Sequence, residues 1–323
     1  ESSVLLSILR PISLLESGQV DLSGRQASLI TAACMTAVAK ILADPCAPAP
    51  LVKAMVAVAL KVSSGGKELP TDMKTAIRIL MKACLSNEAI TIKDHSEIAV
   101  AMAQSRDWEA WSVVVQAKDG EAAKASLTIV QKGLLDSAND AAQLPVLTSL
   151  RNLLQATPPP NDLTGRFACS VLAEVLTVFQ AYGTMQVPPQ VQSHQTTVCA
   201  DAMKIILVAI QQFSSDGTPE EDVAQFLLVV FQTLISILRY NGLPNHPSPN
   251  PGSSDPALGR MCAQAITHVA RTAALPFKSS MGLMSEQDRT VLEFAVRAEM
   301  SGYAVAPTQA APKKKLNLQS FKK

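Results

Sequence analysis

Apolar residues recur with helical spacing along almost the whole of this 323-residue chain, and in several long segments they cover more than one helix face. Residues 219–241 are typical, with a broad apolar stripe through Val223, Phe226, Val230 and Leu234. A helix with so wide a stripe buries it only if other helices pack against two of its sides. The repetition of this pattern predicts an all-α chain in which the long helices cover one another.

Short breaks rich in Pro, Gly, Asn or Asp separate the periodic segments, and the pattern between them predicts helices and no strand. Aromatic residues make up only 4% of the chain, which disfavours a β-sandwich. The predicted helices span residues 3–15, 24–43, 49–63, 71–86, 96–104, 107–117, 120–137, 142–156, 163–182, 195–213, 219–241, 256–274 and 285–301.

The spacing of these helices favours antiparallel hairpins stacked side by side. Helices that start near residues 24, 71, 120 and 163 are separated by 47, 49 and 43 positions. HEAT and armadillo repeats have periods of about 40–47 residues. We therefore predict a HEAT/armadillo-like α-solenoid over residues 1–303, with a compact helical bundle as the alternative.

Three connectors and a tail interrupt the helical pattern. The connectors, near residues 155–163, 183–194 and 241–256, are rich in proline, and the third contains Ser248 in front of another proline. That serine is either a site for a proline-directed kinase or an incidental loop residue. Residues 304–323 have little periodicity and low apolar content, so we expect a flexible, disordered basic tail.

The net charge of +1 is unevenly distributed. The tail holds five lysines and no acid after residue 312, which leaves a charge of −4 on residues 1–312. Nucleic-acid binding needs a stripe of uncompensated Lys and Arg, so this balance argues against a nucleic-acid partner.

The tail is the first candidate binding element. In an extended conformation its alternating leucines fall on one side, where they could add a strand to a partner or enter a pocket while the lysines steer toward an acidic surface. The competing interpretations are a solvated end, a nuclear import signal, and weak contact with anionic membranes. The candidate residues are Lys313, Lys314, Lys315, Leu316, Leu318 and Phe321.

Two tryptophans form the second candidate. Trp108 and Trp111 are three positions apart and so lie on one helix face. The pattern favours packing against the next hairpin, and an exposed aromatic anchor for a partner is the alternative.

No residue set in the sequence predicts catalysis, a cofactor or a metal site. The four histidines, His95, His194, His246 and His268, have no partner at a catalytic spacing, and no metal-binding motif is present. The Gly-Gly-Lys at residues 65–67 lacks the rest of a phosphate-binding loop and is read as a helix end.

The cysteines and the longest apolar runs are both interpreted as parts of buried helices. Six scattered cysteines, with no Cys-x-x-Cys pair, are typical of buried free thiols in a cytosolic protein. The runs at residues 205–210 and 226–238 are shorter than the roughly 20 apolar residues that span a bilayer. We therefore expect no transmembrane segment.

Three features together resemble the C-terminal end of the HEAT repeat-containing protein 5 family. They are the Ala- and Leu-rich hairpins, the last helix MSEQDRTVLEFAVRAEMSGY and the closing KKKLNLQSF. The chain starts at Glu1 inside a helical pattern, so we expect a C-terminal part of a longer chain.

The resemblance implies a non-enzymatic scaffold in clathrin-adaptor-dependent traffic between the trans-Golgi network and endosomes. The implied partners are other proteins, among them clathrin-adaptor accessory proteins, and the implied location is cytoplasmic or peripheral on those membranes. A karyopherin-like or other HEAT/armadillo peptide-cargo adaptor is one alternative, and a helical regulatory domain of an enzyme is the other.

Overall fold

The part of the chain described by the structure, a computed structural model, consists of helices joined by short turns. It comprises Arg10 and residues 25–44, 47–64, 69–87, 90–117, 121–135, 140–154, 162–185, 192–215, 217–242 and 255–302. Within those residues no strand occurs, and the prediction of an all-α chain is confirmed for them.

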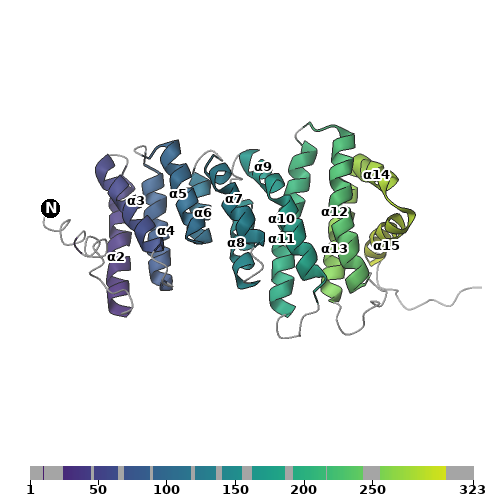
Figure 1. The fold of residues 1–323 in the computed structure, drawn as a ribbon, viewed down its shortest axis with the longest axis horizontal. Helices are drawn as coiled ribbons and strands as arrows, with labels where there is room; N and C mark the ends of the chain where they lie inside the picture. Colours follow the sequence, from purple (N-terminus) through teal and green to yellow (C-terminus); the bar gives the residue numbers. More distant parts are fainter. Residues whose placement is uncertain are drawn as a thin grey trace, which may run out of the picture. The chain divides into compact units, whose positions relative to one another are not determined.

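Fourteen helices, labelled in Figure 1, make up the described chain. They are α2 (Arg25–Leu42), α3 (Ala49–Ser64), α4 (Thr71–Leu85), α5 (Ile92–Gln104), α6 (Trp108–Ala117), α7 (Glu121–Leu135), α8 (Asp140–Leu154), α9 (Asp162–Ser170), α10 (Leu172–Gly183), α11 (Gln192–Ser215), α12 (Glu220–Asn241), α13 (Pro256–Thr272), α14 (Ala274–Leu283) and α15 (Glu286–Gly302).

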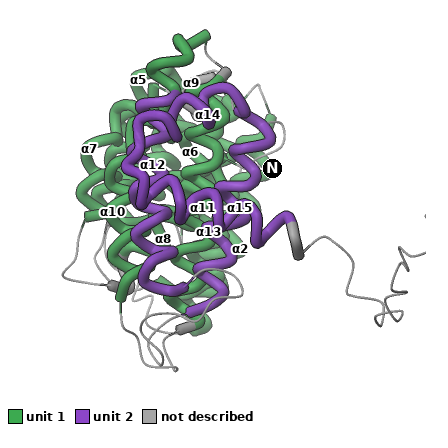
Figure 2. The backbone as a smooth tube through the Cα atoms, turned by 90° about the vertical axis from the view of Figure 1, so that its right-hand side faces the viewer, with its two compact units in different colours: residues 1–223 green, residues 224–323 purple. Residues whose placement is uncertain are grey.

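The chain divides into two compact units, residues 1–223 and residues 224–323, which Figure 2 colours separately. The division falls within α12 and not at one of the predicted connectors.

Unit 1 contains two rows of helices. In one row α2 packs against α4, α4 against α6, α6 against α8, and α8 against α11. In the other, α3 packs against α5, α5 against α7, and α7 against both α9 and α10. The rows are joined by contacts between chain neighbours, α3 with α4, α5 with α6, α7 with α8 and α10 with α11, as can be followed in Figure 1.

The observed contacts change the predicted assignment of helices to repeats. The spacing of helix starts near residues 71 and 120 predicts alternate helices of one repeat, but α4 and α7 belong to different rows. The two short helices between them, α5 and α6, form a complete hairpin of their own. The 49-residue interval is therefore a coincidence of helix lengths and not a repeat period.

The helix predicted at residues 163–182 is interrupted at Val171, which separates α9 from α10. At this point the Gln131 side chain of α7 donates a hydrogen bond from Nε2 to the Ser170 carbonyl, 3.2 Å away. The Ser170 hydroxyl also donates to the Arg166 carbonyl. The interruption is short, because the Val171 N–H still donates to the Phe167 carbonyl at 3.2 Å and the Val171 carbonyl accepts from the Val175 N–H at 3.0 Å. No proline or glycine marks the position in the sequence.

The helix α14 in unit 2 was not predicted, because its sequence ALPFKSSMGL has no amphipathic pattern. Its proline lies in the first turn, where the missing N–H costs no helical hydrogen bond. Ser280 is its one buried residue, and the Phe277 ring packs edge-on against that of Phe231 in α12, with centroids 5.5 Å apart. Leu275 and Leu283 remain more than half exposed.

Three buried amide side chains form hydrogen bonds between successive helices, each across a gap in the described residues. Gln143 of α8 donates to the Leu134 carbonyl near the end of α7 at 2.9 Å. Gln195 of α11 donates to the Tyr182 carbonyl at the end of α10. In unit 2, the Asn241 side-chain oxygen accepts a 2.8 Å hydrogen bond from the backbone N–H of Asp255, which precedes α13. Each amide satisfies a backbone group at a helix end that has no partner within its own helix.

Two helices are long and apolar enough to cross a membrane by length and composition, over Ser193–Ser214 in α11 and Glu220–Asn241 in α12. About half of each apolar window, 50% and 56%, is buried inside the structure, as in core helices. In α11, Asp201 is buried and forms an ion pair with Arg151 of α8. The described residues thus contain no clear transmembrane segment.

Candidate functional site

The chain between α5 and α6 is a tight corner held by backbone hydrogen bonds. The Arg106 N–H donates to the Ala103 carbonyl, and the Asp107 N–H donates to the Met102 carbonyl, both at 3.1 Å. This pair of bonds is the Schellman ending of a helix, which requires a left-handed residue in the Arg106 position. Arg106 has φ of 59°, and it is the only non-glycine residue with positive φ in the described chain. A left-handed non-glycine residue costs on the order of 1 kcal/mol.

Asp107 ends one helix and begins the next. Its carboxylate accepts a 3.1 Å hydrogen bond from the Ala110 N–H, and its carbonyl accepts the first helical bond of α6 from Trp111. A carboxylate at this position caps the helix and complements its dipole. Because Asp107 is fixed by both helices, Trp108 at the start of α6 has a defined position beside α7.

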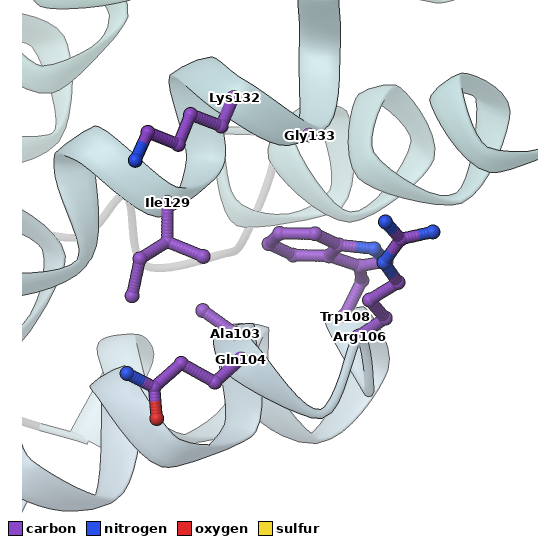
Figure 3. Close-up of a pocket in the computed structure, with 7 residues that line it drawn as sticks. All are labelled: Ala103, Gln104, Arg106, Trp108, Ile129, Lys132 and Gly133. Carbon is purple, nitrogen blue, oxygen red and sulfur yellow. The ribbon is translucent and has the colours of Figure 1, made fainter. Parts of the chain in front are cut away.

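A pocket of about 420 Å³ lies at this corner, between the C-terminal ends of α5 and α7, and Figure 3 shows it. The two helices pack side by side in one row of unit 1. In Figure 3 the Trp108 ring and the Arg106 side chain stand together at one end, and Ile129 faces Ala103. The lining residues are Ala103, Gln104, Arg106, Trp108, Ile129, Lys132 and Gly133.

Gly133 lets the Trp108 ring lie close against α7. A Cβ at this position would be 3.0 Å from Cζ2 of Trp108 and 3.4 Å from Cγ2 of Val146 in α8. The first distance is tighter than ordinary van der Waals contact, so any side chain here displaces the ring or the helix. The glycine therefore determines the shape of this wall of the pocket.

Two cationic side chains stand at the edge of the pocket. Arg106 and Lys132 are exposed there, and none of the seven lining residues is acidic. The nearby Asp107 carboxylate caps α6, and Glu109 of α6 is in an ion pair with Arg78 of α4. Cations at the C-terminal ends of helices complement the helix dipole, which accounts for a lysine and an arginine in these positions.

Both predicted tryptophans are buried, which is the packing arrangement that the sequence favoured. Trp108 is 5% exposed and Trp111 is fully buried, so neither projects from the surface as an exposed anchor. The Trp111 indole donates a 2.8 Å hydrogen bond to the Ser126 hydroxyl of α7. Its ring lies 6.0 Å from that of Phe167 in α9. Trp108, 6.1 Å from Trp111 and edge-on to it, forms a pocket wall.

A second polar cluster lies between α8 and α11. Arg151 Nη1 is 2.7 Å from Asp201 Oδ1, and the Thr148 hydroxyl donates to Asp201 Oδ2 at 2.9 Å. The Asp201 side chain is 2% exposed, so this carboxylate is saturated and removed from solvent. Such a group holds helices together and has no access to a substrate.

The histidines do not converge on the pocket. His95 is buried in α5, His194 of α11 lies beside the Tyr182 ring with centroids 6.2 Å apart, and His268 is exposed on α13. His246 is outside the described residues. Within the described ranges, no group of three or more His, Cys, Asp or Glu residues could hold a metal ion.

The five cysteines in the described ranges form no disulfide. Burial raises the pKa of the Cys84 thiol in α4 to about 12 and also raises that of Cys34 in α2. A thiol with so high a pKa is a poor nucleophile at neutral pH, because the thiolate is the reactive form. Cys46 lies outside the described residues.

The tail residues predicted as a binding element, Lys313, Lys314, Lys315, Leu316, Leu318 and Phe321, lie outside the described residues, as does Ser248. The pocket itself was missed by sequence reasoning apart from Trp108. Ile129, Lys132 and Gly133 come to Trp108 only through the packing of α5 on α7, which no local pattern encodes.

Comparison of the chain with known protein families, with curated proteins and with solved structures finds no significant match in any of the three.

Proposed function

We propose that this chain is a non-catalytic scaffold for protein–protein interaction, built as an α-solenoid of stacked antiparallel hairpins. The observation that carries the proposal is the repeated pairing of alternate helices in unit 1, which forms two rows joined by contacts between chain neighbours. In a solenoid each hairpin contacts only its neighbours, and the stack offers a long surface of helix faces and seams to large partners. The pocket between α5 and α7 lies in one such seam.

The cellular role that we propose is assembly of clathrin-adaptor-dependent traffic between the trans-Golgi network and endosomes. It is supported by the resemblance of the hairpins, the last helix and the KKKLNLQSF ending to the HEAT repeat-containing protein 5 family. The proposed location is cytoplasmic, with peripheral attachment to those membranes through partner proteins and a minor contribution from the basic tail.

Affinity purification combined with proximity labelling of the whole chain in cells tests this role. We expect recovery of clathrin-adaptor accessory proteins and labelling of Golgi and endosomal membranes. A partner list made up of nuclear-import cargo would support a karyopherin-like adaptor instead. Constant recovery of one enzyme, with a change in its turnover when the chain is added, would support a regulatory domain.

The tail is tested in the same experiment by a variant in which Leu316, Leu318 and Phe321 are replaced with Ala. We expect this variant to recover fewer partners while its helicity by circular dichroism is unchanged. The matched control replaces Gln319 and Ser320 with Ala, which leaves the apolar residues in place. Equal recovery by both variants would show that the tail is only a solvated end.

A further inference from the structure

We propose that α14 lies against an anionic membrane surface, with Leu275 and Leu283 at the acyl boundary and Lys278 among the headgroups. The inference rests on the proposed peripheral location and assigns a direct membrane contact to one helix of unit 2. Three observations support it: the outward face of α14 is apolar, the helix is held in one orientation, and the exposed charges around it in the sequence are positive.

The outward face of α14 carries leucines where a helix of a folded domain usually carries polar residues. Leu275, Lys278, Gly282 and Leu283 stand at positions i, i+3, i+7 and i+8, which fall on one side of a helix. All four are exposed, the two leucines by 67% and 56%. The other side, with Phe277, packs against the domain. The helix is therefore apolar on both sides, which explains why its sequence shows no amphipathic pattern.

The two helices next to α14 in the chain have mainly polar outward faces. On α13 the exposed side chains include Arg260, Gln264 and His268. On α15, Arg297 and Glu293 form an ion pair on the surface. The apolar outward face thus distinguishes α14 from its chain neighbours, and exposed leucines of this kind are typical of a surface that is covered by something else.

The orientation of α14 is fixed by contacts on its inner side. The helix packs against α13, and its Phe277 ring lies edge-on against Phe231 of α12, as can be followed in Figure 1. The Arg289 side chain of α15 donates a 3.1 Å hydrogen bond from Nε to the Met281 carbonyl near the end of α14. With these contacts in place, the two leucines point away from the domain.

The charge of the surrounding sequence selects an anionic partner. Residues 256–285 contain no Asp or Glu. Three cations lie in this stretch, and all are exposed: Arg260, Arg271 and Lys278. The next acids belong to the first turn of α15, where Glu286 complements the helix dipole and Asp288 forms an ion pair with an arginine of α12. An anionic surface complements these cations, whereas the basic tail of the same chain does not.

The size of the face favours a membrane over a folded protein. A stable protein interface takes about 800 Å² from each partner, and two leucine side chains on a ten-residue helix supply only a small part of that area. Membrane contact instead combines several weak signals, and the five lysines after residue 312 supply another. Leu275 and Leu283 are about 12 Å apart along the axis, so a helix parallel to the membrane places both at one depth.

The test measures sedimentation of the whole chain with vesicles of phosphatidylcholine, with and without phosphatidylserine. We expect binding to the vesicles that contain phosphatidylserine. Replacing both Leu275 and Leu283 with Gln should weaken this binding by about tenfold, and Lys278→Glu should weaken it by about fivefold. Helicity by circular dichroism should be unchanged, because all three side chains are exposed.

Two matched controls change comparable residues on other helices. Val229→Gln removes an apolar side chain of α12 that is 55% exposed, and Lys204→Glu reverses an exposed charge on α11. Both variants should bind vesicles within about twofold of the wild type. In a third arm, the five lysines of the tail are replaced with Gln, which should weaken binding of the wild type and of the leucine variant alike.

A separate measurement shows whether α14 enters the lipid. Leu283→Trp places a tryptophan on the outward face, and vesicles with brominated acyl chains should quench its emission. The wild type supplies the background, because Trp108 and Trp111 are both buried. Emission that brominated lipid leaves unchanged would contradict insertion.

Three further outcomes would overturn the proposal. The first is vesicle binding that depends on the tail lysines and is unaffected by the leucine variant. The second is loss of partner proteins by the leucine variant with full vesicle binding, which would make α14 a protein-binding surface. The third is self-association that the leucine variant abolishes, which would assign the face to a second copy of the chain.

The outcomes separate this inference from the proposed function. If the wild type recovers clathrin-adaptor accessory proteins but binds no vesicles, the membrane contact of α14 fails and the scaffold role stands. If vesicle binding depends on Leu275 and Leu283 but no trafficking protein is recovered, the membrane contact stands and the proposed cellular role fails.

Discussion

The α5–α7 and α8–α11 contacts lie in the two rows of unit 1, and they differ in how deeply their charged residues are buried. Between α8 and α11, Arg151 meets the buried Asp201 carboxylate at 2.7 Å, and Thr148 takes the other oxygen. Between α5 and α7, Arg106 and Lys132 stand at the edge of an open pocket that contains no acidic lining residue.

The difference shows that neighbouring helices in this unit are held together in two ways. In the closed contact the protein supplies both signs, and the ion pair fixes how α8 lies on α11. In the open contact Gly133 lets the Trp108 ring lie against α7, and the cationic side chains stand at the surface. Substitutions in the α8–α11 contact should therefore lower the free energy of unfolding more than substitutions in the α5–α7 contact.

The largest loss of stability is expected for Arg151→Ala. The variant leaves the Asp201 carboxylate buried with only the Thr148 hydroxyl as its described partner. Removing one member of a buried pair costs about 3 kcal/mol in the free energy of unfolding, and urea unfolding followed by circular dichroism measures it.

The control for this variant is the double replacement Arg151→Met with Asp201→Leu, which removes both charges and should regain most of the lost stability. A loss below about 0.5 kcal/mol for Arg151→Ala, the size of an ordinary surface substitution, would show that the pair does not hold the contact together.

A smaller loss is expected for Gly133→Ala in the open contact. The new methyl group would lie 3.0 Å from the Trp108 ring, and the overpacking should cost about 2.5 kcal/mol. Alanine regains about 1 kcal/mol of helix propensity, so the net loss should be about 1.5 kcal/mol. Tryptophan emission should shift in parallel.

The matched substitution is Gly282→Ala in α14, where an added methyl group meets no atom within 4 Å. This variant should be more stable than the wild type by about 0.5 kcal/mol. Equal effects of the two alanines would mean that the close approach of Trp108 to α7 has no energetic consequence.

The smallest effect is expected at the other end of α5, far from the pocket along the helix. The Thr91 hydroxyl accepts from the Asp94 N–H at 3.2 Å, and the Asp94 carboxylate accepts from the Thr91 N–H at 2.8 Å. Thr91→Ala removes half of this capping box and should cost about 1 kcal/mol at pH 7.

The same capping box predicts a pH dependence with a definite sign. Hydrogen bonds from the Thr91 backbone and side chain hold the pKa of Asp94 below its ordinary value. A depressed folded-state pKa stabilises the fold above the unfolded pKa of about 3.9, and this contribution is lost as the pH falls through the folded value. Unfolding of wild type and Asp94→Asn should therefore differ at pH 7 and converge in acid. A constant difference down to the lowest pH would contradict this assignment.

The long amphipathic helices were the part of the fold that sequence could predict. The wide stripe through Val223, Phe226 and Val230 predicts burial, and Val223 and Val230 are buried while Phe226 is half-buried. The starts of α4 at Thr71 and of α12 at Glu220 lie within one residue of the predicted starts at 71 and 219. These features depend on spacing along one chain segment, which a sequence displays directly.

The remaining features depend on contacts between segments. The interruption at Val171 has no proline or glycine to mark it, and α14 forms without an amphipathic pattern of its own. The pocket needs Gly133 to approach Trp108 across α5 and α7. The sequence could identify Trp108 as a residue of interest, but its role as a pocket wall arises only from packing.

The buried amides that join successive helices have a consequence for how this chain can be altered. Because Gln143, Gln195 and Asn241 each bind backbone at the end of a neighbouring helix, the ends of each connection are fixed independently of the residues between them. Replacing one of these amides with an apolar side chain would therefore leave a buried backbone group at a helix end without that partner, and both sides of the connection would loosen together.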